Sequence, residues 1–163
     1  MIRKIFTLVT VVMLSLVFLS DQALAAGGGG GDRDYNPTSK DSVNFKKGKS
    51  AVQSEQYETA IQHLLKASYE SPKNADVFNL LGFSYRKLGK FDQSFDYYNK
   101  ALSINPKHRG ANEYIGELYL QTNNLAGAEK HLKVLDKVCW FGCAEYDELK
   151  EAIAKYKAEN QLE

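Results

Sequence analysis

The sequence predicts an all-α fold, a right-handed α-solenoid of three helix-turn-helix repeats followed by one capping helix. Three observations predict it: small residues recur every 34 residues, apolar residues recur at helical spacing inside each unit, and a last amphipathic segment has no second helix after it. The formal net charge is +1. This balance does not favour nucleic acid or an anionic membrane as a partner, because both call for a clustered positive excess.

Residues 1–26 have the pattern of a secretory signal peptide. Two basic residues precede an apolar run over residues 5–19, and small side chains stand at the two places that signal peptidase recognises, in residues 23–25. The run is shorter than the about 20 residues that cross a bilayer comfortably. We therefore expect cleavage and export, to the periplasm of a Gram-negative bacterium, with no membrane insertion afterwards. An uncleaved N-terminal anchor is the alternative.

Residues 27–40 begin with five consecutive glycines. A glycine-rich stretch can cradle phosphate when it joins a strand to a helix and is completed by Lys and Ser or Thr. No strand precedes this one, and such a composition buries little and is costly to order. We expect a flexible Gly-rich linker here.

Residues 41–142 divide into three units of equal length, 41–74, 75–108 and 109–142. Glycine occupies the eighth place of every unit, and the twentieth place is always small. These positions hold Gly48, Gly82 and Gly116, then Ala60, Ser94 and Ala128. A glycine inside a helix costs about 1 kcal/mol relative to alanine, so its return at one phase suggests a steric need where two helices cross.

The middle unit carries this pattern most fully. Its apolar and small positions are Phe78, Leu81, Gly82, Tyr85, Leu88, Gly89, Phe91, Ala101 and Pro106. Repeats of this length with these residues resemble the tetratricopeptide repeat family. The resemblance implies a protein-binding solenoid whose first helices line a concave groove. The family's carboxylate-clamp pattern is not reproduced, since Phe45, Gly110 and Tyr114 stand where it would place basic side chains.

Helical spacing within the middle unit gives the same fold. Phe78, Leu81 and Tyr85 lie on one face of a first helix, and a second apolar face follows the turn at residues 88–90. Two helices joined by so short a turn pack antiparallel. In this arrangement we expect Gly82 to lie opposite Ala101.

Residues 143–163 are expected to form the capping helix and tail. Apolar residues recur there at spacings of three and four, with Glu and Lys on the opposite face. The apolar positions are Tyr146, Leu149, Ile153 and Tyr156. Because no further hairpin follows, this helix should cover the open edge of the third repeat.

Cys139 and Cys143 are the only cysteines. An even pair in an exported protein favours a disulfide, and Gly142 between them allows a non-helical turn. The alternative is a thiol-redox or copper-handling site, because paired thiolates bind soft metals and exchange electrons. Such a copper site would need a histidine, and His131 is the nearest candidate.

The predicted function is a protein-protein interaction module that binds a peptide or helical segment of an envelope protein in its concave groove. No catalytic residue, cofactor or metal ligand is assigned, and the histidines are expected at the surface. The candidate groove residues are Phe45, Lys49 and Gln53 in the first repeat, Asn79, Phe83 and Arg86 in the second, and Glu113, Glu117 and Gln121 in the third. For Phe83, an anchoring role and packing against a neighbouring repeat are equally open.

Overall fold

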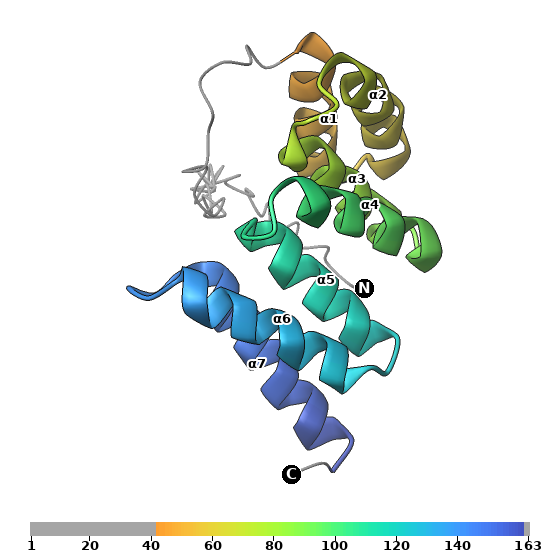
Figure 1. Cartoon of the computed structure of the whole chain (residues 1–163). Helices are drawn as coiled ribbons and strands as arrows, with labels where there is room; N and C mark the ends of the chain where they lie inside the picture. The colour runs from red at the N-terminus through yellow and green to blue at the C-terminus, as the bar shows by residue number, and fades with distance from the viewer. Residues whose placement is uncertain (1–41, 162–163) are drawn as a thin grey trace, which may run out of the picture.

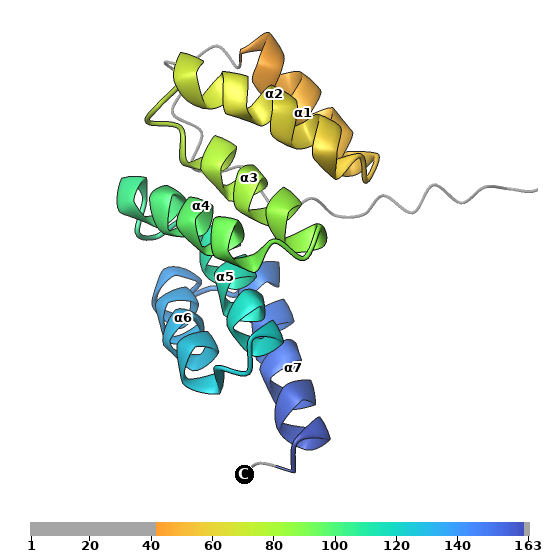
Figure 2. The same cartoon turned by 90° about the vertical axis from the view of Figure 1, so that its right-hand side faces the viewer.

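The computed structural model describes residues 42–161, and the signal-peptide and linker predictions lie outside them. Seven helices and no strands make up this part of the chain. They are α1 (Val43–Gln53), α2 (Tyr57–Glu70), α3 (Ala75–Lys87), α4 (Phe91–Ile104), α5 (Arg109–Gln121), α6 (Leu125–Val138) and α7 (Ala144–Glu159). Figures 1 and 2 show three hairpins stacked one on the next, with α7 at the far end. The predicted all-α solenoid is confirmed.

The turn inside each hairpin has one left-handed residue at the same place in the repeat. Glu55, Gly89 and Asn123 have φ angles of 57°, 70° and 58°. Glycine and asparagine tolerate this region, whereas a glutamate there is strained by its Cβ atom. The three turns therefore share one backbone path although their sequences differ.

Side chains cap the first helix of each hairpin. The Ser42 hydroxyl accepts a hydrogen bond from the Phe45 N–H, and the Asn74 side-chain oxygen Oδ1 accepts one from the Asp76 N–H. In the third hairpin the imidazole of His108 takes this place. Each cap satisfies a backbone donor that the helix leaves free, which fixes where α1, α3 and α5 begin.

The recurring glycines lie at helix crossings, as the spacing predicts. A Cβ atom on Gly48 would stand 2.6 Å from the side chain of Leu64, and one on Gly82 would stand 2.5 Å from the ring of Tyr98. The side chain nearest to Gly82 at this crossing is therefore Tyr98, not the expected Ala101. The ring of Tyr98 lies directly over the glycine, because a bulky residue on α4 fills the space that the absent Cβ leaves.

The third hairpin uses its glycine differently. A Cβ atom on Gly116 would meet Leu149 of α7 at 2.6 Å, so the crossing here is between α5 and the capping helix. Leu149 and Ile153 are buried, and α7 covers both α5 and α6. Among the described residues no helix is long and apolar enough to cross a membrane.

Candidate functional site

Five of the nine predicted groove residues remain accessible. Lys49, Gln53 and Gln121 are exposed, and Phe83 and Glu117 are half-buried. They lie on the first helices α1, α3 and α5, which the repeat pattern assigns to the concave side. Their role in binding stays a prediction.

The other four are buried, and the prediction that they point outward is wrong. Phe45 belongs to the core shared by the first two hairpins, and Asn79 faces Gly110 at the start of α5. Arg86 is buried by the rings beside it, and Glu113 is covered where α7 packs on α5. The cause is similar for three of them: Asn79 and Arg86 on α3 lie against residues of α5, and Glu113 on α5 lies against α7, so the next element in the stack covers each side chain.

An aromatic cluster with two cations occupies the centre of this surface. Phe83 lies between Tyr57 of α2 and Tyr114 of α5, with ring centroids 6.1 Å and 5.1 Å away. The guanidinium of Arg86 stands 5.5 Å from the rings of both Phe83 and Tyr114, and the ammonium of Lys87 stands 5.6 Å from Phe83. We call Tyr57, Phe83, Arg86, Lys87 and Tyr114 the aromatic cluster. The cluster joins all three repeats, so Phe83 does pack against its neighbours, but its ring is only partly buried.

Arg86 holds the cluster together. Its Nη1 donates to the carboxylate of Glu117 on α5, and the pair is mostly shielded from water. A buried cation that lost its partner would be strongly destabilising. Burial raises the pKa of the neighbouring Tyr114 hydroxyl to about 12, with nearby carboxylates adding to the effect. Arg86 is thus a structural residue of the surface, whereas the exposed Lys87 is free to contact a ligand.

Carboxylates crowd the junction of α5 and α7, but each is compensated. Burial and the adjacent Glu148 raise the pKa of Glu113 to about 9, so this carboxyl is protonated at neutral pH and hydrogen-bonded to Glu148. Glu145 lies 3.8 Å from Arg109, and Glu117 is paired with Arg86. No group of His, Cys, Asp or Glu within residues 42–161 is arranged to hold a metal ion.

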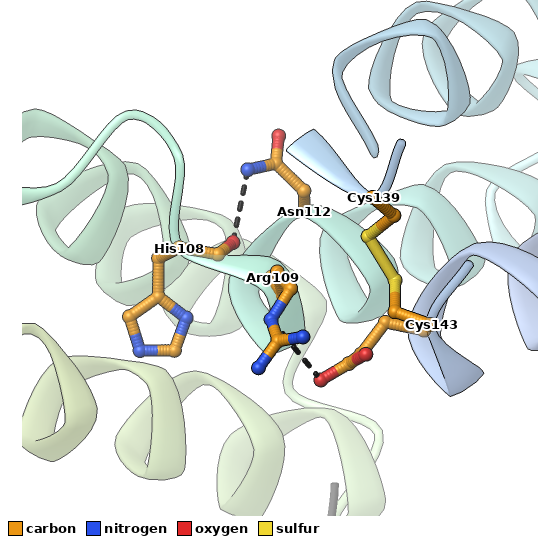
Figure 3. The surroundings of a disulfide bond; sticks show 6 residues. His108, Arg109, Asn112, Cys139 and Cys143 are labelled. Atoms are coloured by element: carbon orange, nitrogen blue, oxygen red, sulfur yellow. Dashed lines mark hydrogen bonds and ion pairs between the residues drawn. A yellow bond between two sulfur atoms is a disulfide. The ribbon is translucent and has the colours of Figure 1, made fainter. Parts of the chain in front are cut away.

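Cys139 and Cys143 form a disulfide, with their Cα atoms 5.5 Å apart. Cys139 directly follows α6, Cys143 precedes α7, and Gly142 between them has φ +87°. Figure 3 shows the disulfide beside the start of α5, near Arg109 and Asn112. Since both sulfur atoms are in this bond, neither is a thiolate ligand in this state.

His131 is buried, contrary to the surface position expected for it. Its Nδ1 lies 2.9 Å from the Asn112 side-chain oxygen and its ring stacks on Tyr119. Burial lowers its pKa to about 4, so the ring is neutral at physiological pH. It packs inside the third hairpin rather than completing a copper site.

His108 is also a structural residue. Its Nδ1 accepts the Ala111 N–H at 3.1 Å, which places the ring proton on Nε2, 2.9 Å from the Asp76 carboxylate. The ring therefore caps α5 and ties it to the start of α3.

Sequence reasoning missed three members of the aromatic cluster, Tyr57, Lys87 and Tyr114. Tyr57 opens the second helix of its repeat, where repeat patterns place a core residue. The signal that could have found them is their sequence offset from Phe83: Lys87 is one helical turn after it, and Tyr114 is 31 positions on, near the equivalent place in the next repeat.

Comparison with known proteins agrees with this fold. The family model of the tetratricopeptide repeat matches residues 75–108, which are α3, α4 and their flanking loop residues. The chain is a tetratricopeptide-repeat protein. A TPR repeat-containing protein of Borreliella burgdorferi is 36% identical over 90 residues, which is 55% of this chain and 36% of that protein. The chain spans about a third or less of the curated relatives it matches.

Two solved structures illustrate the likeness of this tetratricopeptide-repeat protein in three dimensions. The Yersinia enterocolitica type III secretion chaperone SycD, in complex with a peptide of the translocator YopD, gives a TM-score of 0.62 at 19% identity, covering 72% of this chain and 89% of that one. The first TPR of Spaghetti (RPAP3), bound to an HSP90 peptide, gives 0.62 at 22% identity, covering 71% and 91%. At such identities the likeness shows the fold.

Proposed function

We propose that this protein is a periplasmic interaction module whose concave face holds a segment of an envelope protein, and that it carries out no catalytic step. The observation that supports the proposal most is the aromatic cluster. Three partly buried rings and an exposed ammonium lie together on one surface, built from helices of all three repeats. Aromatic side chains in such places supply much of the energy of protein recognition.

The chemistry of the cluster suggests what its ligand offers. The rings of Tyr57, Phe83 and Tyr114 would pack against an apolar side chain, and Lys87 would bind a carboxylate or a backbone carbonyl next to it. Because Arg86 already binds Glu117, a single cation remains available within the cluster. A single cation differs from a clamp of several basic side chains that binds a free C-terminal carboxylate. The cluster therefore suits an internal segment of a partner better than a chain end.

Two further observations support parts of the proposal. SycD and the first TPR of Spaghetti were each solved with a bound peptide, so this fold is able to hold a peptide segment. The signal-peptide pattern of residues 1–26 and the disulfide both suit an oxidising compartment outside the cytoplasm. These two features support the periplasm as the location that we propose, and with it a partner in the envelope.

Comparative capture from envelope extracts tests the proposal. Phe83→Ala and Lys87→Glu should each reduce recovery of a common partner, by roughly tenfold if a contact of about 1.4 kcal/mol is lost. Tyr69→Ala is the matched control, since Tyr69 is an aromatic residue that is 86% exposed at the far end of α2. If Tyr69→Ala and Phe83→Ala lower recovery equally, or if neither does, the concave cluster is not the binding surface. Cell fractionation of the native protein tests its location separately.

A further inference from the structure

The loop that joins α6 to α7 carries two adjacent exposed aromatic rings. Trp140 and Phe141 are 78% and 84% exposed, although both are large apolar side chains. Their ring centroids are 3.8 Å apart, so the rings pack on each other. Figure 1 shows this loop extending beyond the helices at the end of α6. It is separate from the aromatic cluster of the proposed function.

The backbone holds this ring pair in place. The disulfide closes the five-residue loop, the Gly142 N–H donates to the Cys139 carbonyl at 2.6 Å, and Gly142 takes the left-handed conformation. The rings therefore stand on a short, closed turn between two helix ends. Little conformational freedom remains to be lost when they bind, which favours binding.

We propose that this loop, through Trp140 and Phe141, docks on the interfacial region of a lipid bilayer. Tryptophan favours the boundary between headgroups and acyl chains, and an apolar neighbour adds buried area. The loop from Cys139 to Cys143 contains no charged side chain, and its one strong side-chain donor, the indole N–H of Trp140, can bond to water or headgroup oxygens in that region. A contact that selects one protein usually adds several polar groups that fix orientation, and the tip has only this indole N–H.

The area of the two exposed rings and the charges near the loop indicate what kind of surface the loop binds. Two aromatic side chains offer roughly 300–500 Å² between them, whereas a stable dimer buries about 800 Å² on each partner. The exposed charges within one turn of the loop have both signs: Asp136 and Lys137 lie in the last turn of α6, and Asp147 lies in the first turn of α7. They give no excess of positive charge to attract anionic lipids. The surface that fits is a zwitterionic one, and the attachment is peripheral and reversible.

Trp140 itself reports the contact, because it is the only tryptophan in the chain. The purified chain is mixed with phosphatidylcholine vesicles, and then with vesicles whose acyl chains carry bromine, which quenches indole emission on contact. Docking predicts that Trp140 emission moves to shorter wavelength and is quenched by the brominated lipid. Both effects should be nearly independent of salt. Since the emission arises in the loop alone, an N-terminal apolar segment that bound vesicles by itself would not produce them.

Variants separate the aromatic tip from the rest of the chain. Phe141→Ala keeps the reporter, and it should raise the lipid concentration needed for half of the emission change by roughly tenfold. Tyr69→Ala removes an equally exposed aromatic from another site and should leave the titration unchanged. Circular dichroism should show the same helix content for all three proteins.

Several results would overturn the proposal. One is Trp140 emission that neither vesicle preparation changes. Another is a shift that appears with protein concentration alone, which would make a second copy of the chain the occupant. A third is an emission change that only a purified protein partner of the loop produces, which would make the tip a protein anchor. A response confined to anionic vesicles and abolished by salt would also contradict docking through apolar contact.

Discussion

Replacing Gly82 by alanine tests the close crossing of α3 and α4 directly. The added Cβ would lie 2.5 Å, 2.7 Å and 2.9 Å from three ring carbons of Tyr98. Carbon atoms in normal contact are about 3.5 Å apart. The Tyr98 side chain is fully buried, so the ring has no free space into which it can withdraw. An overlap of this kind costs about 3 kcal/mol, the upper end of the usual range for overpacking.

Helix propensity acts in the opposite direction. Alanine is about 1 kcal/mol better than glycine inside a helix, so Gly82→Ala should destabilise the protein by a net of about 2 kcal/mol. In a Tyr98→Ala background the overlap disappears and only the propensity term remains. There the same substitution should stabilise the protein by about 1 kcal/mol. The sign of the effect therefore depends on whether the ring is present.

Urea denaturation followed by far-ultraviolet circular dichroism measures all four proteins of this double-mutant cycle. The expected coupling between Gly82 and Tyr98 is about 3 kcal/mol. Tyr98→Ala alone should cost about 3–5 kcal/mol, as a large truncation in a core does. If Gly82→Ala has the same effect with and without the ring, the two residues are not in contact and the assigned crossing is wrong.

Four further predictions concern separate parts of the chain. Glu55→Gly should stabilise the protein by about 1 kcal/mol in urea denaturation, and Gly89→Ala should destabilise it by a similar amount, because both sites are left-handed and an added Cβ at Gly89 meets nothing. Burial lowers the pKa of His131 to about 4 in the folded chain, so the unfolded chain takes up a proton at higher pH than the folded one. The free energy of unfolding should therefore fall by roughly 3 kcal/mol as the pH drops from 6.5 to 4. In an acid titration, His131→Gln should remove this dependence of stability on pH. The pKa of Glu113 is raised to about 9, so stability should fall as the pH rises from 4.5 towards 9, and Glu113→Gln should raise the thermal midpoint at pH 7 by an amount equivalent to roughly 2–3 kcal/mol. Replacing both cysteines by serine should cost only about 2 kcal/mol in calorimetry, because the closed loop is short.

The sequence predicts the helices and hairpins because the signals for them are local. Apolar spacing defines each helix face. The turn at residues 88–90 and the equivalent turns of the other repeats are so short that the two helices they join must pack antiparallel. The glycine positions also predict where helices cross. Their partners were not predictable, since Tyr98 rather than Ala101 covers Gly82 and Leu149 of the capping helix covers Gly116.

The candidate site was predictable only in outline, because burial on the concave side depends on neighbouring repeats. Phe83 was found from its place on a first helix. Whether Arg86 is exposed depends on how closely α5 approaches α3, and whether Glu113 is exposed depends on where α7 lies. The spacing of apolar residues within one repeat contains no information on how these helices are placed. His131 shows the same limit, since its burial follows from its contact with Asn112 across the hairpin.

Site-specific photo-cross-linking tests the central claim most directly, namely that the concave aromatic cluster is the surface that holds a protein segment. A photoreactive amino acid is placed at Lys87, inside the cluster, and in a second protein at Tyr69, which is also exposed but lies elsewhere. The account predicts that irradiation in cells links the Lys87 position to one partner, through one continuous segment, and that Phe83→Ala abolishes this product. A product that forms at Tyr69 alone, or one at Lys87 that survives Phe83→Ala, would contradict it.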